Sequence, residues 1–309
     1  MNNDKGNILA LSPLADPVFN EVFANVEVAG LAMESFIRAV LEADNEILVG
    51  KIKSVTPQRV HSSVMQRGSR VDIEIETEAD ELIIAEIQID PDIRIMVRNL
   101  FTSSHVFRES SVKGDTPTQM AKRMPKVIHI NLLGYKVRKS SKELLEPFKI
   151  LYTKKPHDVA IPNFSGYNIQ LPIIAKMELD FTNALHCWCY AIYTAHVENK
   201  TLQEVVEMSK PLQDYAVRDP GFVQFCERYK IVASDPTAQR QYIAWIKDIM
   251  REQGIKEAAW LEGLEEGKKE GIETVALNML RKNHPVELVA ELTSLPIEEV
   301  KALTVSSVQ

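Results

Sequence analysis

The feature that most constrains the fold is a stretch in which two strand-like segments flank a short polar turn. Residues 70–88 read RVDIEIETEADELIIAEIQ, with acids alternating with β-branched residues before the turn and a nearly unbroken apolar run after it. Alternation with a period of two is typical of a strand with two different faces, and a short apolar run is consistent with a central, buried strand. The stretch therefore predicts an antiparallel hairpin inside a larger sheet.

The register of this hairpin determines what its acidic residues do. If residues 78–80 form the loop, residues whose numbers sum to 158 face each other, and Asp72 lies opposite Glu86. Directly opposed residues have Cβ atoms roughly 4.5–5.5 Å apart, and like charges there are destabilising. A shift of one residue would put the two acids on opposite faces. The expected register requires a compensating group, and a divalent cation is the simplest one.

The distribution of charge suggests what such a cation would meet. Residues 94–142 include eleven basic and two acidic residues, so this basic window carries +9, while the rest of the chain carries −16 within a net charge of −7. Such asymmetry indicates a polyanion-facing surface, although a merely solvated basic face is the alternative. Mg²⁺ takes one or two carboxylates, several waters and substrate phosphate as ligands. The combination predicts metal-assisted phosphodiester hydrolysis.

The hairpin also has a plainer interpretation. An edge hairpin with a wet acidic face needs no metal, and Glu74 and Glu76 favour this view because they extend the acidic stripe beyond what one ion needs. Against it, Glu86 interrupts an apolar run, where a polar residue is costly unless it is paired. Arg94 and Arg98, one helical turn apart, follow within about ten residues on a helix and favour a phosphate-binding site.

The flanking segments predict an α/β domain. Asp16 and Pro17 are a natural N-cap and first residue for a helix, and the hydrophobic period changes from helix to strand after residue 43. The expected order is helix 17–26, helix 30–43, strands within 45–55, 70–77 and 81–89, helix 92–110, and strands 125–134 and 148–153. This order indicates a central mixed sheet with helices on its faces, followed from about residue 183 by mostly helical chain.

Residues 236–309 predict a helical tail. Its long helical pattern contains glycines at 254, 263, 267 and 271, and each weakens a helix by roughly 1 kcal/mol relative to alanine. This helix therefore needs partners or it frays. Two short helices around Pro296 resemble a helix-turn-helix, but the second lacks the basic residues of a DNA reader. We expect an oligomerisation or docking tail, with DNA reading as the alternative.

Composition limits the class of protein. The 309 residues are 45% hydrophobic and 26% charged, as in an ordinary soluble globular protein. No segment offers about 18 uninterrupted apolar residues, and the first residues lack the pattern of a secretory leader. Three cysteines without a second ligand pair at zinc spacing predict buried thiols. The expectation is a cytoplasmic protein that does not enter membranes.

At these residues the sequence resembles a known superfamily. The Asp of RVD, the hairpin, Glu-Ile-Gln, an Arg-containing helix and the step GDT resemble the PD-(D/E)xK nucleases. The segments DPVFNEVF, LPIIAKMELDF and EGLEEGKKEG are similar to the Rpn family of recombination-promoting nucleases, also described as transposases. The resemblance covers about residues 8–235 and continues loosely through the tail. It implies a restriction-endonuclease-like α/β core, with a central mixed β-sheet flanked by helices and a helical C-terminal region.

The resemblance implies roles position by position. Asp72 and Glu86 match the metal-binding carboxylates, and Glu34 fits an acid that several members supply from an early helix. For Glu34, an exposed pairing with Arg38 is an equal alternative. Gln88 stands where much of the superfamily has Lys, so it can position the attacking water but cannot supply charge.

The implied function is a metal-dependent DNA endonuclease associated with recombination or mobile elements. Arg94, Arg98 and Lys113 are expected to bind DNA phosphates, and the implied cofactor is Mg²⁺, with Mn²⁺ as the alternative. Gln88 keeps open a second function, that of a catalytically weak or inactive nuclease-fold protein that binds DNA or organises an assembly. A homo-oligomer formed through the C-terminal helices is a further expectation.

Overall fold

The computed structural model describes residues 10–23, 26–47, 50–58, 60–63, 66–91 and 94–306. The chain divides into two compact units, the first ending at Trp245 and the second beginning at Ile246. The first unit holds the sheets and the second holds only helices. The roles expected for residues 8–235 and 236–309 stay predictions.

A six-stranded mixed sheet with the order β1-β4-β5-β6-β8-β7 forms the centre of the first unit. Its strands are β1 (Ile52–Pro57), β4 (Ile73–Thr77), β5 (Glu81–Gln88), β6 (Lys126–Leu133), β7 (Leu145–Tyr152) and β8 (Lys155–Gln170). The strands β5, β6 and β8 are parallel, whereas the other pairs are antiparallel. A separate hairpin consists of β2 (Val60–Ser63) and β3 (Gln66–Arg70). The expected mixed sheet is confirmed.

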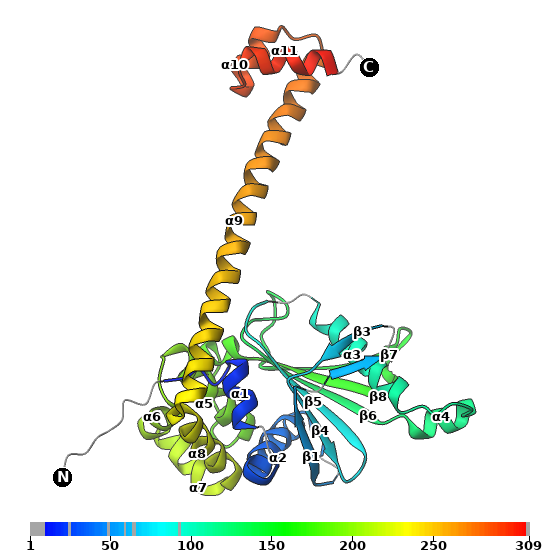
Figure 1. Ribbon diagram of the computed structural model, residues 1–309, viewed down its shortest axis with the longest axis vertical. Coiled ribbons are helices and arrows are strands. Elements are labelled where there is room, and N and C mark those ends of the chain that lie inside the picture. The colour runs from blue at the N-terminus through cyan, green and yellow to red at the C-terminus, as the bar shows by residue number, and fades with distance from the viewer. Residues whose placement is uncertain are drawn as a thin grey trace, which may run out of the picture. The chain divides into compact units, whose positions relative to one another are not determined.

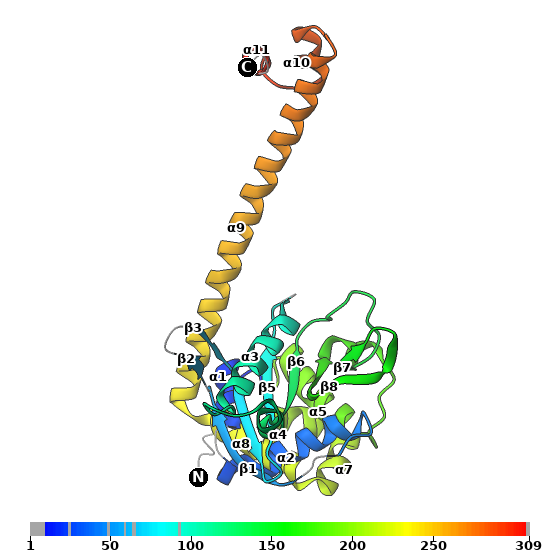
Figure 2. The same cartoon turned by 90° about the vertical axis from the view of Figure 1, so that its right-hand side faces the viewer.

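Helices lie on both sides of this sheet. In both views α3 (Ile95–Glu109) lies above the sheet and α2 (Val26–Glu42) below it (Figures 1 and 2). The other helices of this unit are α1 (Asp16–Val22), α4 (Pro117–Arg123), α5 (Ala184–Val197), α6 (Leu202–Met208), α7 (Lys210–Arg218), α8 (Pro220–Ser234) and the 3-10 helix η1 (Leu171–Lys176). The helical chain expected from about residue 183 begins at Asn183, whose side chain caps α5.

The first strand is shorter than the sequence predicted. It was expected within 45–55 but begins at Ile52. Residues 43–45 form a turn in which Asn45 has a φ of 56°, a left-handed conformation that asparagine tolerates. Residues 48–49 of the expected strand lie outside the described residues.

The longest strand, β8, is absent from the sequence prediction. It contains Pro156 and Pro162, which normally argue against a strand because proline cannot donate to the ladder. Both prolines precede Phe164, where β8 first pairs with β6, so they lie where the strand has only β7 as a neighbour. The pairing with β7 is irregular there, which accommodates the prolines.

The second unit has a small core of its own. The helix α9 (Pro236–Arg281) runs into it and is followed by α10 (Val286–Thr293) and α11 (Ile297–Ser306). The buried residues of this core are Ala276, Val289, Ala290 and Val300. By contrast, every residue from 251 to 272 is exposed. Most helical stability in proteins comes from packing of an amphipathic face, and these exposed residues lack such packing in the described structure.

In the first unit, α2 and α8 approach closely at Gly221. A Cβ on this glycine would lie 2.4 Å from the carbonyl oxygen of Leu31 and 2.5 Å from Ser35 Cβ. Next to it, the N-cap residue Asp219 accepts hydrogen bonds from the hydroxyls of Ser35 and Tyr215. The glycine and the cap together fix how α8 crosses α2.

Gly221→Ala is expected to lower the free energy of unfolding by about 1–3 kcal/mol, because the backbone of α2 must move to admit a methyl group. Gly254→Ala is the matched control, since a Cβ at Gly254 meets no atom within 4 Å. This control should instead stabilise α9 by about 1 kcal/mol. Denaturant unfolding followed by circular dichroism measures both, and the same sign of change in the two variants would contradict the prediction.

Candidate active site

The hairpin formed by β4 and β5 has the register that the sequence predicted. All paired residues sum to 158, and residues 78–80 form the turn. Asp72 lies just before β4, and its Oδ2 accepts a 2.9 Å hydrogen bond from the backbone N–H of Ile87. The carboxylate of Asp72 therefore lies against β5 beside Glu86, at the carboxyl end of a parallel strand. Ligands of open α/β sheets bind at such strand ends.

Arg98 connects α3 to the two polar residues of β5. Its Nη2 lies 3.4 Å from Glu86 Oε2, and its Nη1 donates a 3.0 Å hydrogen bond to Gln88 Oε1. Gln88 Nε2 donates in turn to the carbonyl of Asp90 at 3.2 Å. Both ends of the Gln88 amide are thus engaged. The positive charge that Gln88 cannot carry is supplied next to it by Arg98.

Burial makes this ion pair important. The side chain of Glu86 is only 4% exposed, whereas that of Arg98 is 43% exposed. A buried carboxylate is costly unless a cation or hydrogen-bond donors compensate for its charge. Arg98 supplies such a charge from the solvent side. A divalent cation at Glu86 would compete with this guanidinium.

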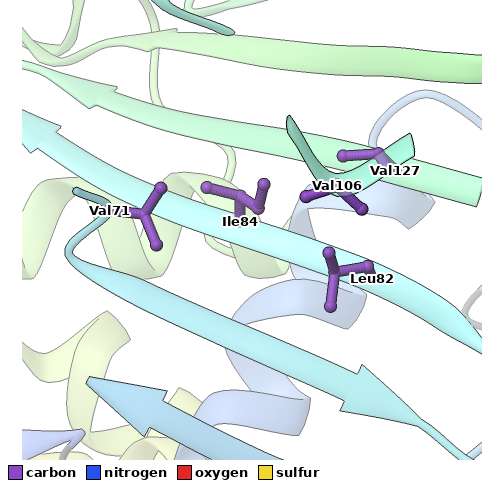
Figure 3. Close-up of a cluster of buried hydrophobic side chains, with 5 residues drawn as sticks. All are labelled: Val71, Leu82, Ile84, Val106 and Val127. Carbon is purple, nitrogen blue, oxygen red and sulfur yellow. The ribbon is translucent and has the colours of Figure 1, made fainter. Parts of the chain in front are cut away.

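The C-terminal half of α3 anchors the helix on the sheet. Val106 packs against Leu82, Ile84 and Val127 in a cluster that also includes Val71 (Figure 3). This apolar contact fixes one end of α3. The other end presents Arg98 to β5.

The remaining predicted phosphate-binding residues lie at different ends of α3. The backbone N–H of Arg98 donates to the carbonyl of Arg94 at 2.8 Å, which confirms that the two arginines are one turn apart. Lys113 is exposed and follows the end of this 15-residue helix, which spans about 22 Å. Lys113 is therefore far from Glu86. The DNA contacts of all three residues stay predictions.

The side chain of Glu34 makes its ion pair within α2 and not with the hairpin. Its Oε1 accepts a 2.8 Å hydrogen bond from Arg38, which is the alternative pairing expected from the sequence. It lines a cavity of about 370 Å³ together with Arg218 and Asp219. The described residues contain no group of three His, Cys, Asp or Glu side chains suited to a metal ion, so Glu34 does not form one with the hairpin acids. Its role as a ligand stays a prediction.

The other two acids of β4 differ from each other. Glu76 is exposed, with Oε2 3.6 Å from Lys53 Nζ, so it fits the wet acidic face. Glu74 is only 6% exposed, and a solvated role for it is wrong. Glu74 pairs with Ile84 of β5, and Val106 of α3 packs over this position. The Glu74 side chain lines a cavity of about 280 Å³ with Glu109 and Ser110, near the C-terminal end of α3.

A row of polar residues beneath α3, which consists of Glu86, Asn131 and Asn168, was not predicted from the sequence. In the parallel register Glu86 pairs with Asn131, and Asn131 pairs with Asn168. Asn131 Nδ2 donates to Asn168 Oδ1 at 2.8 Å. The alternation Ile-His-Ile-Asn-Leu at 128–132 indicates this row, because it places polar residues in a strand whose other residues are apolar.

The cysteines take no part in this site. Cys187 and Cys189 are buried and unbridged, as expected, and Cys226 is partly exposed. Burial raises the pKa of the Cys187 thiol to about 12, so this thiol stays protonated near neutral pH.

Asp72 and Glu86 form a donor set that suits a hard divalent ion. Mg²⁺ and Mn²⁺ prefer carboxylate oxygens and complete their shells with waters and phosphate, so two carboxylates suffice. Neither the amide of Gln88 nor the guanidinium of Arg98 is a sulfur or imidazole ligand of the kind that zinc prefers. The residues at the hairpin end therefore fit the cofactor that the resemblance implies.

Comparison with known proteins decides the family. A family described as PD-(D/E)XK nuclease family transposase matches residues 13–259. The chain belongs to this family. The PD-(D/E)XK nuclease fold expected from the hairpin motif is thereby confirmed, and membership supports hydrolysis of nucleic acids or a mobile-element role. No curated protein and no solved structure matches the chain.

None of the helices among the described residues is both long enough and apolar enough to cross a bilayer.

Arg98→Met tests whether the guanidinium compensates for the buried carboxylate. In EDTA at pH 7 the free energy of unfolding should fall by about 1–3 kcal/mol, because a buried acid loses a charged donor. Arg94→Met is the control, since this exposed arginine should change stability by less than about 0.5 kcal/mol. Adding Glu86→Gln to Arg98→Met should recover part of the loss in a double-mutant cycle. Equal effects of the two arginine variants would refute the compensation.

Proposed function

We propose that the protein is a divalent-metal-dependent DNA endonuclease that serves recombination or a mobile element. The observation that carries this proposal is the convergence of Asp72, Glu86, Gln88 and Arg98 at the carboxyl end of β5. Membership in a nuclease family supports it. Asp72 and Glu86 would hold Mg²⁺ or Mn²⁺, with Glu34 as a further candidate ligand.

When bound, the ion would activate a water and neutralise charge on the phosphoryl group. The side chains have separate tasks. Gln88 holds Arg98 through its amide oxygen and orients the attacking water with its remaining hydrogen-bonding capacity. With an ion bound there, Glu86 would have another partner for its charge, and the planar fork of Arg98 would suit a pair of phosphate oxygens.

Binding of DNA depends on the basic window, residues 94–142. Several of its cations already pair with acids, so fewer than eleven are available for phosphates. These pairs are Arg98 with Glu86, Arg123 with Asp115, Lys126 with Glu81 and Arg138 with Glu146. Arg94, Arg98 and Lys113 would contact the backbone, since salt-dependent phosphate contacts supply most of the affinity of a nuclease that reads little sequence.

Plasmid nicking in Mg²⁺ or Mn²⁺ tests the proposal. Asp72→Asn and Glu86→Gln should each lower the nicking rate by about 100-fold or more, because each removes a charged oxygen ligand. Arg98→Gln should also lower the rate, and adding Gln88→Lys should restore part of it by returning a cation to β5. Lys53→Gln, at an exposed pair with Glu76, is the control and should nick normally.

Wild-type nicking that persists in EDTA or in Asp72→Asn would overturn the metal mechanism. DNA binding by the wild-type protein without any nicking would favour the alternative, a nuclease-fold protein that binds DNA or organises an assembly.

We also propose self-association through α9. The exposed part of this helix carries Leu261 and Leu264, which are 49% and 39% exposed, and Ile272 and Val275 continue the same helical spacing. An apolar stripe on a helix with no packing partner is stabilised when a second copy covers it.

Leu261→Glu combined with Leu264→Glu should reduce the mass measured by light scattering to that of a monomer, because charges would replace the apolar contact. Glu266→Gln, exposed on the same helix, is the control and should leave the mass unchanged. A wild-type protein that is monomeric at all concentrations would exclude this association.

A further inference from the structure

The two halves of α3 rest on different kinds of surface. The C-terminal half buries Val106 against apolar residues of β5 and β6 (Figure 3). The segment of the same helix from Met96 to Ser103 makes polar contacts instead. Ser103 Oγ and His129 Nε2 lie 2.7 Å apart, and Asn168 Nδ2 lies 3.8 Å from Met96 Sδ. A helix that covers a sheet normally does so with an apolar stripe, so this polar layer calls for an explanation.

Asn99 lies between these two contacts. It follows Met96 by three residues and precedes Ser103 by four, so all three side chains share one face of α3. On the sheet, Asn131 lies between the partners of the same contacts, because it is two residues beyond His129 on β6 and pairs with Asn168 on β8. Asn99 therefore faces the part of the sheet that carries Asn131.

Both asparagines are fully buried, with exposed fractions of 0%. In the part of the chain that the structure describes, both amide atoms of Asn99 and Oδ1 of Asn131 have no hydrogen-bond partner. The same holds for Nδ1 of His129, whose pKa burial lowers to about 3, so that its ring is neutral. Buried polar atoms in folded proteins are nearly always hydrogen-bonded, to protein groups or to ordered water.

These atoms have the composition of a buried water site. A buried water makes two to four hydrogen bonds, and here α3 and β6 bring to facing surfaces a donor and several acceptors without partners among the described residues. Asn131 is the direct register neighbour of Glu86 on the adjacent strand, and neighbouring strands lie roughly 4.8 Å apart. A water held at Asn99 and Asn131 would therefore lie beside the strand position of the carboxylate that the site depends on.

We propose that Asn99 and Asn131 bind a buried water that hydrogen-bonds to Glu86, and that the two asparagines are positioning residues for this carboxylate. The inference rests on the proposed function, in which Glu86 holds the metal ion. A water suits this place because it can reorient when Arg98 leaves Glu86. A direct amide contact would favour only one of the two arrangements.

A crystal structure of the metal-free full chain, at a resolution that shows ordered waters, tests the water directly. Density for a water within hydrogen-bonding distance of Asn99 and Asn131 is expected. Direct hydrogen bonds between protein groups that satisfy all of these atoms would overturn the proposal. This result does not depend on whether the protein cleaves DNA.

Asn99→Leu tests the positioning role, because it keeps the side-chain volume and removes both amide atoms. The midpoint of thermal unfolding should stay the same or rise, since no protein hydrogen bond is lost. The affinity for Mn²⁺, measured by isothermal titration calorimetry, should fall by about 10-fold, as for other residues that support a metal ligand. Asn99→Ser, which leaves room for water beside a hydroxyl, should retain more of the affinity.

Asn20→Leu is the matched control. Asn20 is also buried, at 8% exposed, and its Oδ1 also has no partner among the described residues, but it lies on α1. Its Mn²⁺ affinity should equal that of the wild type. An unchanged affinity in Asn99→Leu would overturn the positioning role. A wild-type protein that binds no Mn²⁺ would instead refute the proposed function, and the crystallographic result would still decide the water.

Discussion

The site depends on the antiparallel pairing of β4 with β5. In the observed register one face of the hairpin consists of apolar side chains that are at most 5% exposed, and these are Ile73, Ile75, Ile83, Ala85 and Ile87. A slip of one residue in β4 would exchange Ile73 and Ile75 for its carboxylates and bury charge in the core. The burial of isoleucines on one side of the sheet therefore keeps the acids together on the other side.

Much of this arrangement could be predicted from the sequence, because it is local. The two-residue period and the polar turn determine the hairpin and its register, and helical spacing predicts that Arg94 and Arg98 share a face. The contact between Arg98 and Glu86 could not be predicted in this way. It requires that α3 folds back along β5, and the polar row beneath α3 requires that β6 lies beside β5 in parallel register. Both arrangements depend on contacts between residues far apart in the sequence, which local periodicity does not predict.

The position of the positive charge separates this chain from relatives with a lysine on the strand. A lysine at position 88 would carry its charge on β5 itself, whereas the guanidinium of Arg98 reaches Glu86 and Gln88 from a helix. The arginine is 43% exposed and engages two side chains at once. Its charge can therefore compensate for the buried Glu86, and it can instead bind a phosphate when Glu86 has another cation as its partner.

The unequal surfaces under α3 have a thermodynamic consequence. Exposing apolar groups to water raises the heat capacity by roughly 0.45 cal/K/mol per Å², whereas exposing polar groups lowers it by roughly 0.26, so the two contributions offset each other on a mixed surface. Val106 makes the apolar contact of α3, whereas the segment from Met96 to Ser103 contacts amides and an imidazole. A motion that lifts only the Arg98 end would therefore have a small heat-capacity change. The enthalpy of opening the site would then change little with temperature, whereas the enthalpy of unfolding the whole domain changes strongly.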